Sequence, residues 1–184
     1  MKIQSNAPSS ESSSPFYKIN EDFCREFENY IASKNGKVKG KYNAWSYFIQ
    51  GKIPNPKQWY LKYKKATYSS TGNLLLSSKS QSLLTSAEWS TAWAGSQNSE
   101  FSIRRKDDVD LLEKIFKKEL KNYKSYLISG EEKNVILIEN LELALRPLFD
   151  SKEIYSIILK NGKLTISLRT EKHHFDFFEK LSSL

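Results

Sequence analysis

The chain has 184 residues, 39% of them hydrophobic, and its 29 Lys and Arg outnumber its 21 Asp and Glu to give a formal net charge of +8. This length and apolar content are enough for one domain with a buried core, which excludes a wholly disordered protein. The single cysteine excludes an internal disulfide. No apolar stretch reaches the about 18 residues of a transmembrane helix or has the form of a signal peptide, so we expect a cytoplasmic protein.

The first predicted segment is a disordered N-terminal lead over residues 1–15, which are mostly Ser, Asn, Pro and Gln. A single domain is then expected over residues 16–184. Its first helix is predicted to begin at Asn20, a residue type favoured at helix N-caps, and to end at Asn35-Gly36.

Residues 37–70 predict β-strands on either side of a Pro-Asn-Pro breaker at 54–56. After the breaker, Trp59, Leu61 and Tyr63 alternate with more polar residues. A period of two is typical of a strand with one buried and one exposed face.

The middle of the chain predicts two helices around one strand. Residues 85–88 match a capping box and predict a short helix that carries Trp89 and Trp93 on one face. Residues 101–105 predict a strand. Residues 107–120 predict a helix that Asp107 or Asp108 would cap.

The C-terminal part predicts a strand at 123–128 and a helix at 134–149, although the first five residues of that helix could instead be strand. Asn161-Gly162 is the preferred pair for a type I′ turn and predicts a hairpin between strands 154–160 and 163–170. The tail from His174 to Leu184 predicts a closing amphipathic helix. The fold class is therefore α+β, with an antiparallel or mixed sheet of about five to seven strands, three longer helices and one short helix.

Four features of the last third occur together: an aromatic-rich strand at 123–128, a Leu-rich helix, a strand ending in Asn161-Gly162-Lys163-Leu164, and a phenylalanine cluster at 175–178. In this order they resemble an uncharacterised bacterial domain family that is usually attached to transmembrane helices. This chain departs from the family by lacking the spans. Because the family carries no known activity, the resemblance implies fold class and nothing about chemistry.

No recognisable catalytic motif is present, since the phosphate-binding glycine loops and the GxSxG nucleophile elbow are absent. Cys24 lies about 150 residues from both histidines, and the adjacent His173-His174 pair is poorly arranged for chelation. We therefore expect no cofactor, no metal and no catalytic residue. An enzyme whose site is assembled from scattered residues stays open.

The charge excess identifies the one candidate site. Residues 37–70 contain eight lysines and eight aromatic residues, and no Asp or Glu occurs between Glu28 and Glu88. Ammonium groups beside aromatic rings on a sheet face are suited to single-stranded nucleic acid, because they neutralise phosphates while the bases stack. The residues predicted to bind are Lys37, Lys39, Lys41, Trp45, Lys57, Trp59, Tyr60, Lys62, Lys64 and Lys65.

The composition of this segment leaves several partners open. All its cations are lysines, so it lacks the planar guanidinium that favours phosphate and base recognition, and lysines also protect exposed sheet edges. We expect a non-enzymatic binding or adaptor protein whose preferred partner is an acidic protein. A sequence-tolerant single-stranded nucleic-acid-binding protein is the alternative, and an anionic membrane surface is a further possible partner.

Overall fold

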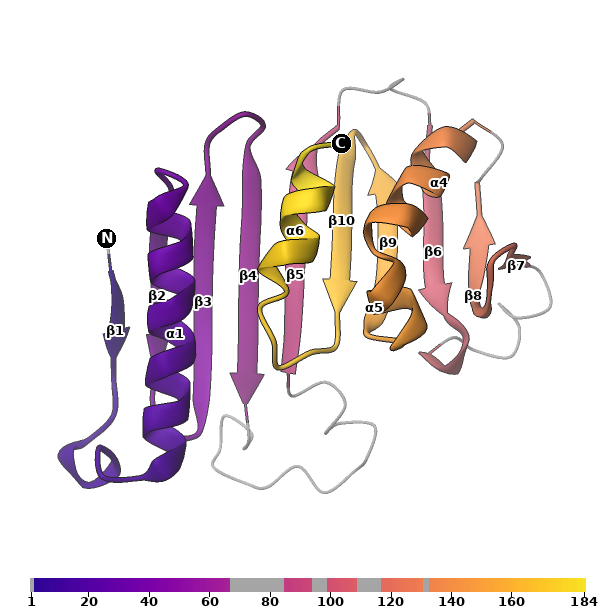
Figure 1. Cartoon of the computed structure of the whole chain (residues 1–184). Coiled ribbons are helices and arrows are strands. Elements are labelled where there is room, and N and C mark those ends of the chain that lie inside the picture. Colours follow the sequence, from indigo (N-terminus) through magenta and orange to yellow (C-terminus); the bar gives the residue numbers. More distant parts are fainter. Residues whose placement is uncertain (1, 67–84, 94–98, 109–116, 131–132) are drawn as a thin grey trace. The chain divides into compact units, whose positions relative to one another are not determined.

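The computed structural model describes residues 2–66, 85–93, 99–108, 117–130 and 133–184 (Figure 1). The sequence predicts one domain after residue 15, whereas the chain divides into two compact units. The first unit comprises Met1–Trp89 and Arg169–His173, and the second comprises Ser90–Leu168 and His174–Leu184.

The first unit is built on strands that follow one another in the order β1-β2-β3-β4-β5. The edge strand β1 runs parallel to β2, and β2, β3 and β4 are antiparallel neighbours. The strands are β1 (Ile3–Ser5), β2 (Lys37–Tyr42), β3 (Ser46–Ile53), β4 (Trp59–Ala66) and β5 (Thr85–Ala92).

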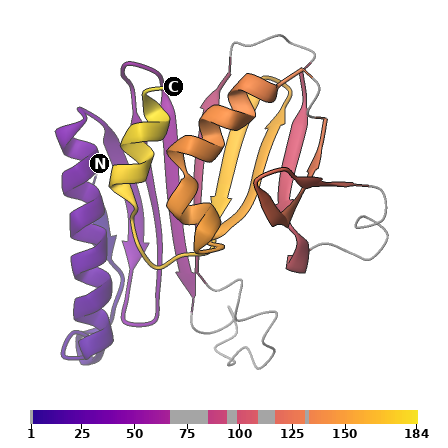
Figure 2. The same ribbon diagram turned by 45° about the vertical axis from the view of Figure 1, so that its right-hand side comes forward.

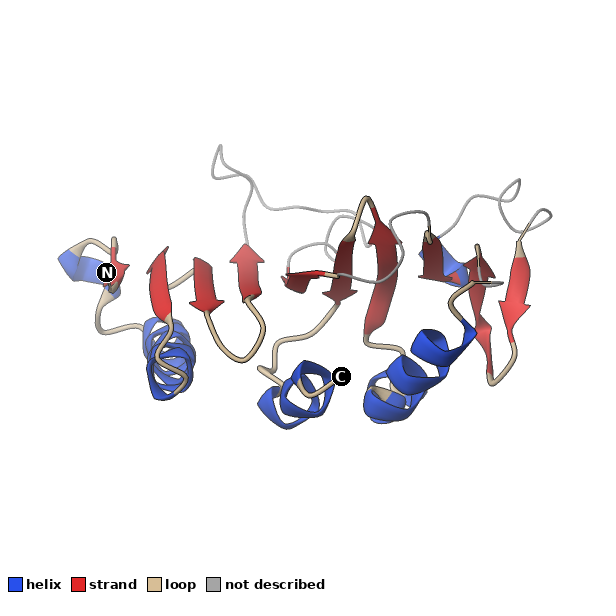
Figure 3. Cartoon of the chain, turned by 90° about the horizontal axis from the view of Figure 1, so that it is seen from above, coloured by secondary structure: helices blue, strands red, loops and turns tan. Residues whose placement is uncertain are grey.

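Helix α1 (Pro15–Ser33) lies on one face of this sheet, against β2 and β3 (Figures 1 and 3). Phe27 and Ile31 are fully buried, and they recur at the spacing that places residues on one side of a helix. The helix approaches β3 closely at Gly51, where an added Cβ would lie 2.6 Å from Cδ1 of Ile31 and 2.9 Å from Cζ of Phe27. A side chain at this position would therefore collide with the core of the first unit.

The start of α1 differs from the predicted cap at Asn20. The helix begins at Pro15, whose fixed φ and missing N–H suit the first turn. Asn20 is instead buried inside the helix, where its Nδ2 donates to the carbonyl oxygens of Asn43 at 2.9 Å and Ala44 at 3.1 Å. Its amide thus ties the helix to the turn between β2 and β3.

Residues 1–15 also differ from the predicted disordered lead. Ile3–Ser5 pairs with β2 in a register that sets Ile3 opposite Gly40 and Gln4 opposite Lys41, and a 3₁₀ turn follows at Ser9–Glu11. Pairing with a strand more than thirty residues away leaves no local pattern in so polar a segment.

In the second unit, the strands follow the order β5-β10-β9-β6-β8-β7, in which β5 takes part through its last residues. The described helices lie on one face of this sheet (Figures 2 and 3). The strands are β6 (Phe101–Arg105), β7 (Lys118–Leu120), β8 (Tyr123–Ser129), β9 (Ile154–Lys160) and β10 (Lys163–Leu168), and the helices are α4 (Val135–Ala144), α5 (Arg146–Asp150) and α6 (Phe175–Ser182).

The predicted hairpin is confirmed. Asn161 and Gly162 have φ of 50° and 67°, the positive values that a type I′ turn requires, and Lys160 lies opposite Lys163. Strand β10 ends at Leu168, two residues before the predicted end. The predicted strands at 101–105 and 123–128 and the predicted helix at 174–184 are also present, whereas the single helix predicted at 134–149 is divided at Leu145 into α4 and α5.

The predicted strand number is wrong, because the described residues form ten strands in a mixed sheet arrangement. The short helix predicted after residue 85 is wrong as well: Thr85–Ala92 is strand β5, with Trp89 fully buried. The helix predicted for 107–120 falls partly outside the described residues. Its described ends are a 3₁₀ turn at Lys106–Asp108 and strand β7.

The described helices agree with the predicted three longer helices and one short helix, since their lengths are 19, 10, 8 and 5 residues. The α+β class is therefore correct, although the short helix is α5 rather than the predicted segment. Within the described ranges, no helix combines the length and apolar character needed to cross a membrane.

We expect Gly51→Ala to lower the free energy of unfolding by about 1–3 kcal/mol, the usual cost of overpacking a core. The added methyl group would press against Ile31 and Phe27 of α1. Urea denaturation measures the change, and Gln50→Ala is the matched control because the neighbouring side chain lies on the opposite face. Equal stabilities of the two variants would contradict the close packing of α1 on β3.

Candidate functional site

The face of β2, β3 and β4 that α1 leaves uncovered carries most of the lysines of residues 37–70. Strand pairing aligns three rows of side chains on it: Lys37, Lys52 and Tyr60; Lys39, Gln50 and Lys62; and Lys41, Phe48 and Lys64. Directly opposed residues of an antiparallel pair lie on the same side of the sheet. These nine residues are called the lysine face below.

The lysine face has little compensating negative charge. Lys62 pairs with Glu88 of β5 at 3.0 Å, and both side chains are partly exposed. Within the described parts of the chain, Lys37, Lys39, Lys41 and Lys64 form no ion pair and are exposed. Their ammonium groups are therefore available to an external anion.

Two aromatic rings lie among these lysines. Phe48 has half of its surface exposed and stands between Lys41 and Lys64, and Tyr60 is 39% exposed. The ammonium group of Lys52 lies 5.7 Å from the centre of the Tyr60 ring, which is a cation–π contact. The lysine face thus presents π-surfaces as well as positive charge.

A hollow of about 510 Å³ opens at the β1 end of the lysine face. Lys2 just before β1 and Gln4 of β1 line it together with Lys39 and Lys41 of β2 and with Phe48 and Gln50 of β3. No carboxylate lines it among the described residues, so an anion could enter without meeting a like charge.

Six of the ten predicted binding residues lie together on the lysine face: Lys37, Lys39, Lys41, Tyr60, Lys62 and Lys64. Trp59 does not, because it is only 2% exposed and belongs to the core with Leu61. The predicted alternation in β4 explains this position, since Trp59 shares its parity with the buried Leu61.

Three further predicted residues also lie elsewhere. Lys65 faces the helix side of the sheet and its ammonium lies 3.8 Å from a carboxylate oxygen of Glu171. Trp45, in the turn before β3, packs against Phe16 of α1 at a ring distance of 5.8 Å. Lys57 lies in the loop before β4, where partial burial lowers its pKa.

Sequence reasoning missed five contributors to this surface. Phe48, Gln50 and Lys52 follow from the alternation of β3 once its buried residues are known, so a parity argument could have found them. Lys2 and Gln4 carry no such signal, because β1 was predicted to be disordered.

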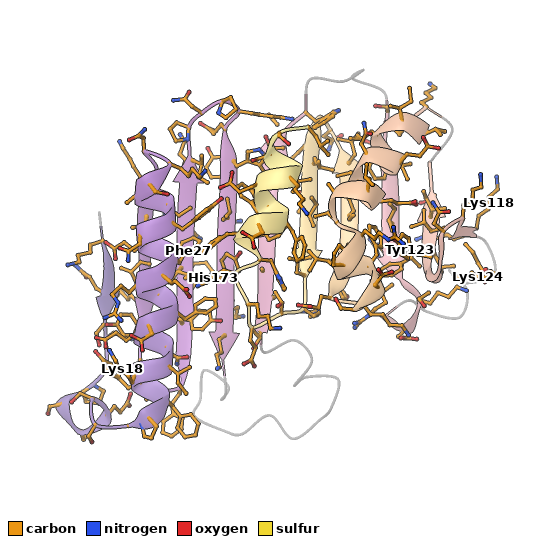
Figure 4. All side chains as sticks on the ribbon, viewed as in Figure 1. Lys18, Phe27, Lys118, Tyr123, Lys124 and His173 are labelled. Carbon is orange, nitrogen blue, oxygen red and sulfur yellow. The ribbon has the colours of Figure 1, made fainter. Side chains whose placement is uncertain are left out.

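Cys24 and His173 are both buried in the first unit. Cys24 is 1% exposed, and burial first and the charge of Glu28 second raise the pKa of its thiol to about 12, so it stays protonated at neutral pH. The His173 ring stacks on Phe23 at 3.7 Å and lies beside Phe27 (Figure 4). Its Nε2 lies 3.0 Å from the carbonyl oxygen of Phe23.

The second unit contains another hollow, of about 530 Å³, beside α4 and Tyr123. Glu139, Glu142 and Asp150 line it together with Arg146, and the buried Glu142 accepts a 2.5 Å hydrogen bond from Asn122. The described residues form no group of three carboxylate, histidine or cysteine side chains that could hold a metal ion. None of the predicted site residues lies here.

No protein-family model, no curated protein and no solved structure matches the chain. The resemblance of the last third to a bacterial domain family therefore stays a prediction, and the site is interpreted from its own chemistry.

The crowding of unpaired lysines gives a testable effect on stability. Replacing Lys39, Lys41 and Lys64 together with Gln should leave the free energy of unfolding at low salt unchanged or raise it by less than about 1 kcal/mol, because repulsion between these charges is removed. The wild-type protein should gain stability as salt screens the repulsion, and the variant should gain less.

Urea denaturation at low and high NaCl measures both effects. The matched control replaces Lys121, Lys124 and Lys133 of the second unit, which are exposed and change the net charge equally. The control should keep the wild-type response to salt. A marked loss of stability in the lysine-face variant would mean that these side chains hold the fold together.

Proposed function

We propose that this chain is a non-enzymatic binding protein whose lysine face binds an acidic macromolecule, and that single-stranded nucleic acid is the partner favoured by the geometry. The observation that carries the proposal is the presence of two exposed rings among unpaired lysines on one sheet face. The sequence alone put an acidic protein first; the position of the rings is the reason to change that order.

The lysines supply the electrostatic part of binding. Residues two apart in a strand are about 6.6 Å apart, so Lys37, Lys39 and Lys41 form an evenly spaced row along β2. Lys62 and Lys64 form a second row along β4. A polyanion with regularly spaced phosphates can contact several of these ammonium groups at once and release its counterions.

The rings supply a stacking contact, which the binding of an acidic protein surface does not require. Phe48 lies on β3 and Tyr60 on β4, in rows that are four residues apart along β3. Stacking of a base on an aromatic ring contributes about 1–3 kcal/mol and tolerates any base. The absence of arginine from this face fits a binder that tolerates many sequences.

An acidic protein remains the second candidate, because the unpaired lysines alone would attract it. The rings would then be ordinary exposed residues of a sheet. No observation on the described residues supports the alternative that the chain is an enzyme.

The proposal predicts salt-dependent binding of a labelled oligothymidylate, measured by fluorescence anisotropy. The logarithm of the association constant should fall linearly with the logarithm of salt concentration, by about 0.7 for each phosphate neutralised. Lys39→Gln, Lys41→Gln and Lys64→Gln together should reduce that slope by up to about 2. The control variant at Lys121, Lys124 and Lys133 should keep the wild-type slope.

Competition separates the partners. Unlabelled oligonucleotide, polyglutamate and vesicles of anionic lipid are each added to the bound probe, and their concentrations are compared per negative charge. We expect the oligonucleotide to displace the probe at a far lower concentration than the other two, because only the oligonucleotide offers bases to the rings. If polyglutamate displaced the probe as well as the oligonucleotide does, an acidic protein would be the favoured partner. If the vesicles did so, an anionic membrane surface would be the favoured partner. No binding of the probe at about 50 mM salt would remove the nucleic-acid proposal.

A further inference from the structure

The hollow at the β1 end of the lysine face combines three kinds of group that the rest of the face does not bring together. Lys2, Lys39 and Lys41 carry positive charge, Phe48 presents an exposed ring, and Gln4 and Gln50 add uncharged amides. Its volume of about 510 Å³ falls within the usual range of about 300–1,000 Å³ for small-ligand pockets.

We propose that this hollow holds one nucleotide of the bound strand. Its phosphate lies among Lys2, Lys39 and Lys41, its base stacks on Phe48, and the amides of Gln4 and Gln50 bond to the edge of the base. This inference rests on the proposed function and deepens it, because it assigns a base-contacting position to a surface that otherwise tolerates any sequence.

The register of the strands supports this arrangement. Gln4, Lys41 and Phe48 occupy one row across β1, β2 and β3, and Lys39 lies directly opposite Gln50 in the next row. Each amide thus stands beside a lysine on the neighbouring strand. A ligand that places an anion over the β2 lysines brings its attached ring within reach of β3.

The amides distinguish this hollow from a plain anion site. A carboxamide carries a donor and an acceptor side by side, which matches the paired donor and acceptor atoms on the edge of a base. A free phosphate or a carboxylate chain uses the lysines and leaves both the amides and the ring without a role. The chemistry therefore selects an anion that carries a flat, hydrogen-bonding ring.

Titration with small probes tests the inference on the whole chain. Adenosine monophosphate, uridine monophosphate and ribose 5-phosphate are titrated separately and followed by NMR chemical shifts. Wild-type protein should bind at least one of the two nucleotides about five-fold or more tightly than ribose 5-phosphate, since stacking adds affinity that the sugar phosphate lacks.

Phe48→Ser should remove most of the difference in affinity between the nucleotide and ribose 5-phosphate, without weakening the binding of ribose 5-phosphate. Phe16→Ser is the matched control, because Phe16 is 56% exposed on α1 and lies outside the hollow. The double variant Gln4→Leu with Gln50→Leu should reduce the difference in affinity between adenosine monophosphate and uridine monophosphate. It should leave the affinity for ribose 5-phosphate unchanged. A purely structural role for the amides would not alter selectivity between bases.

The outcomes separate the inference from the proposed function. If oligonucleotides bind with the expected salt dependence but nucleotides bind no better than ribose 5-phosphate, the hollow is not a nucleotide site and the proposed function survives. An equal loss in Phe16→Ser and Phe48→Ser would also overturn the inference. If oligonucleotides do not bind at all, the proposed function fails and the inference fails with it.

Discussion

The packing of α1 on one face of β2 and β3 is the constraint on which the first unit depends. Phe27 and Ile31 fill that face, and the close approach at Gly51 leaves no room for a side chain. Because successive strand residues point to opposite sides, burying Leu61 and Tyr63 under the helix side forces the residues between them outward. The lysine face is therefore the reverse side of the core, and its composition follows from which residues the helix covers.

Local patterns made much of the fold predictable. The Asn161-Gly162 turn and the alternation of β4 rest on neighbouring residues whose conformations are restricted by their own chemistry. The same alternation could have assigned each lysine to a face. Lys64 and Lys65 are adjacent, so a strand cannot present both to one partner, and the structure separates them.

Distant pairing made the rest unpredictable. Residues 85–88 have the local features of a helix cap, but β5 gains its hydrogen bonds from neighbouring strands, and Trp89 donates a 3.0 Å hydrogen bond to the Tyr63 hydroxyl. Tertiary contacts thus override a local preference. Strand β1 likewise depends on β2, which is why the sequence did not indicate that Lys2 and Gln4 belong to the site.

The central claim is that α1 divides the basic segment into a binding face and a covered face. Acylation of each lysine, quantified by mass spectrometry with and without a single-stranded oligonucleotide, tests it most directly. Lys39, Lys41 and Lys64 should be protected by the oligonucleotide, whereas Lys57 and Lys65 should react at the same rate in both samples. Protection of Lys57 and Lys65 equal to that of the three others would contradict the account.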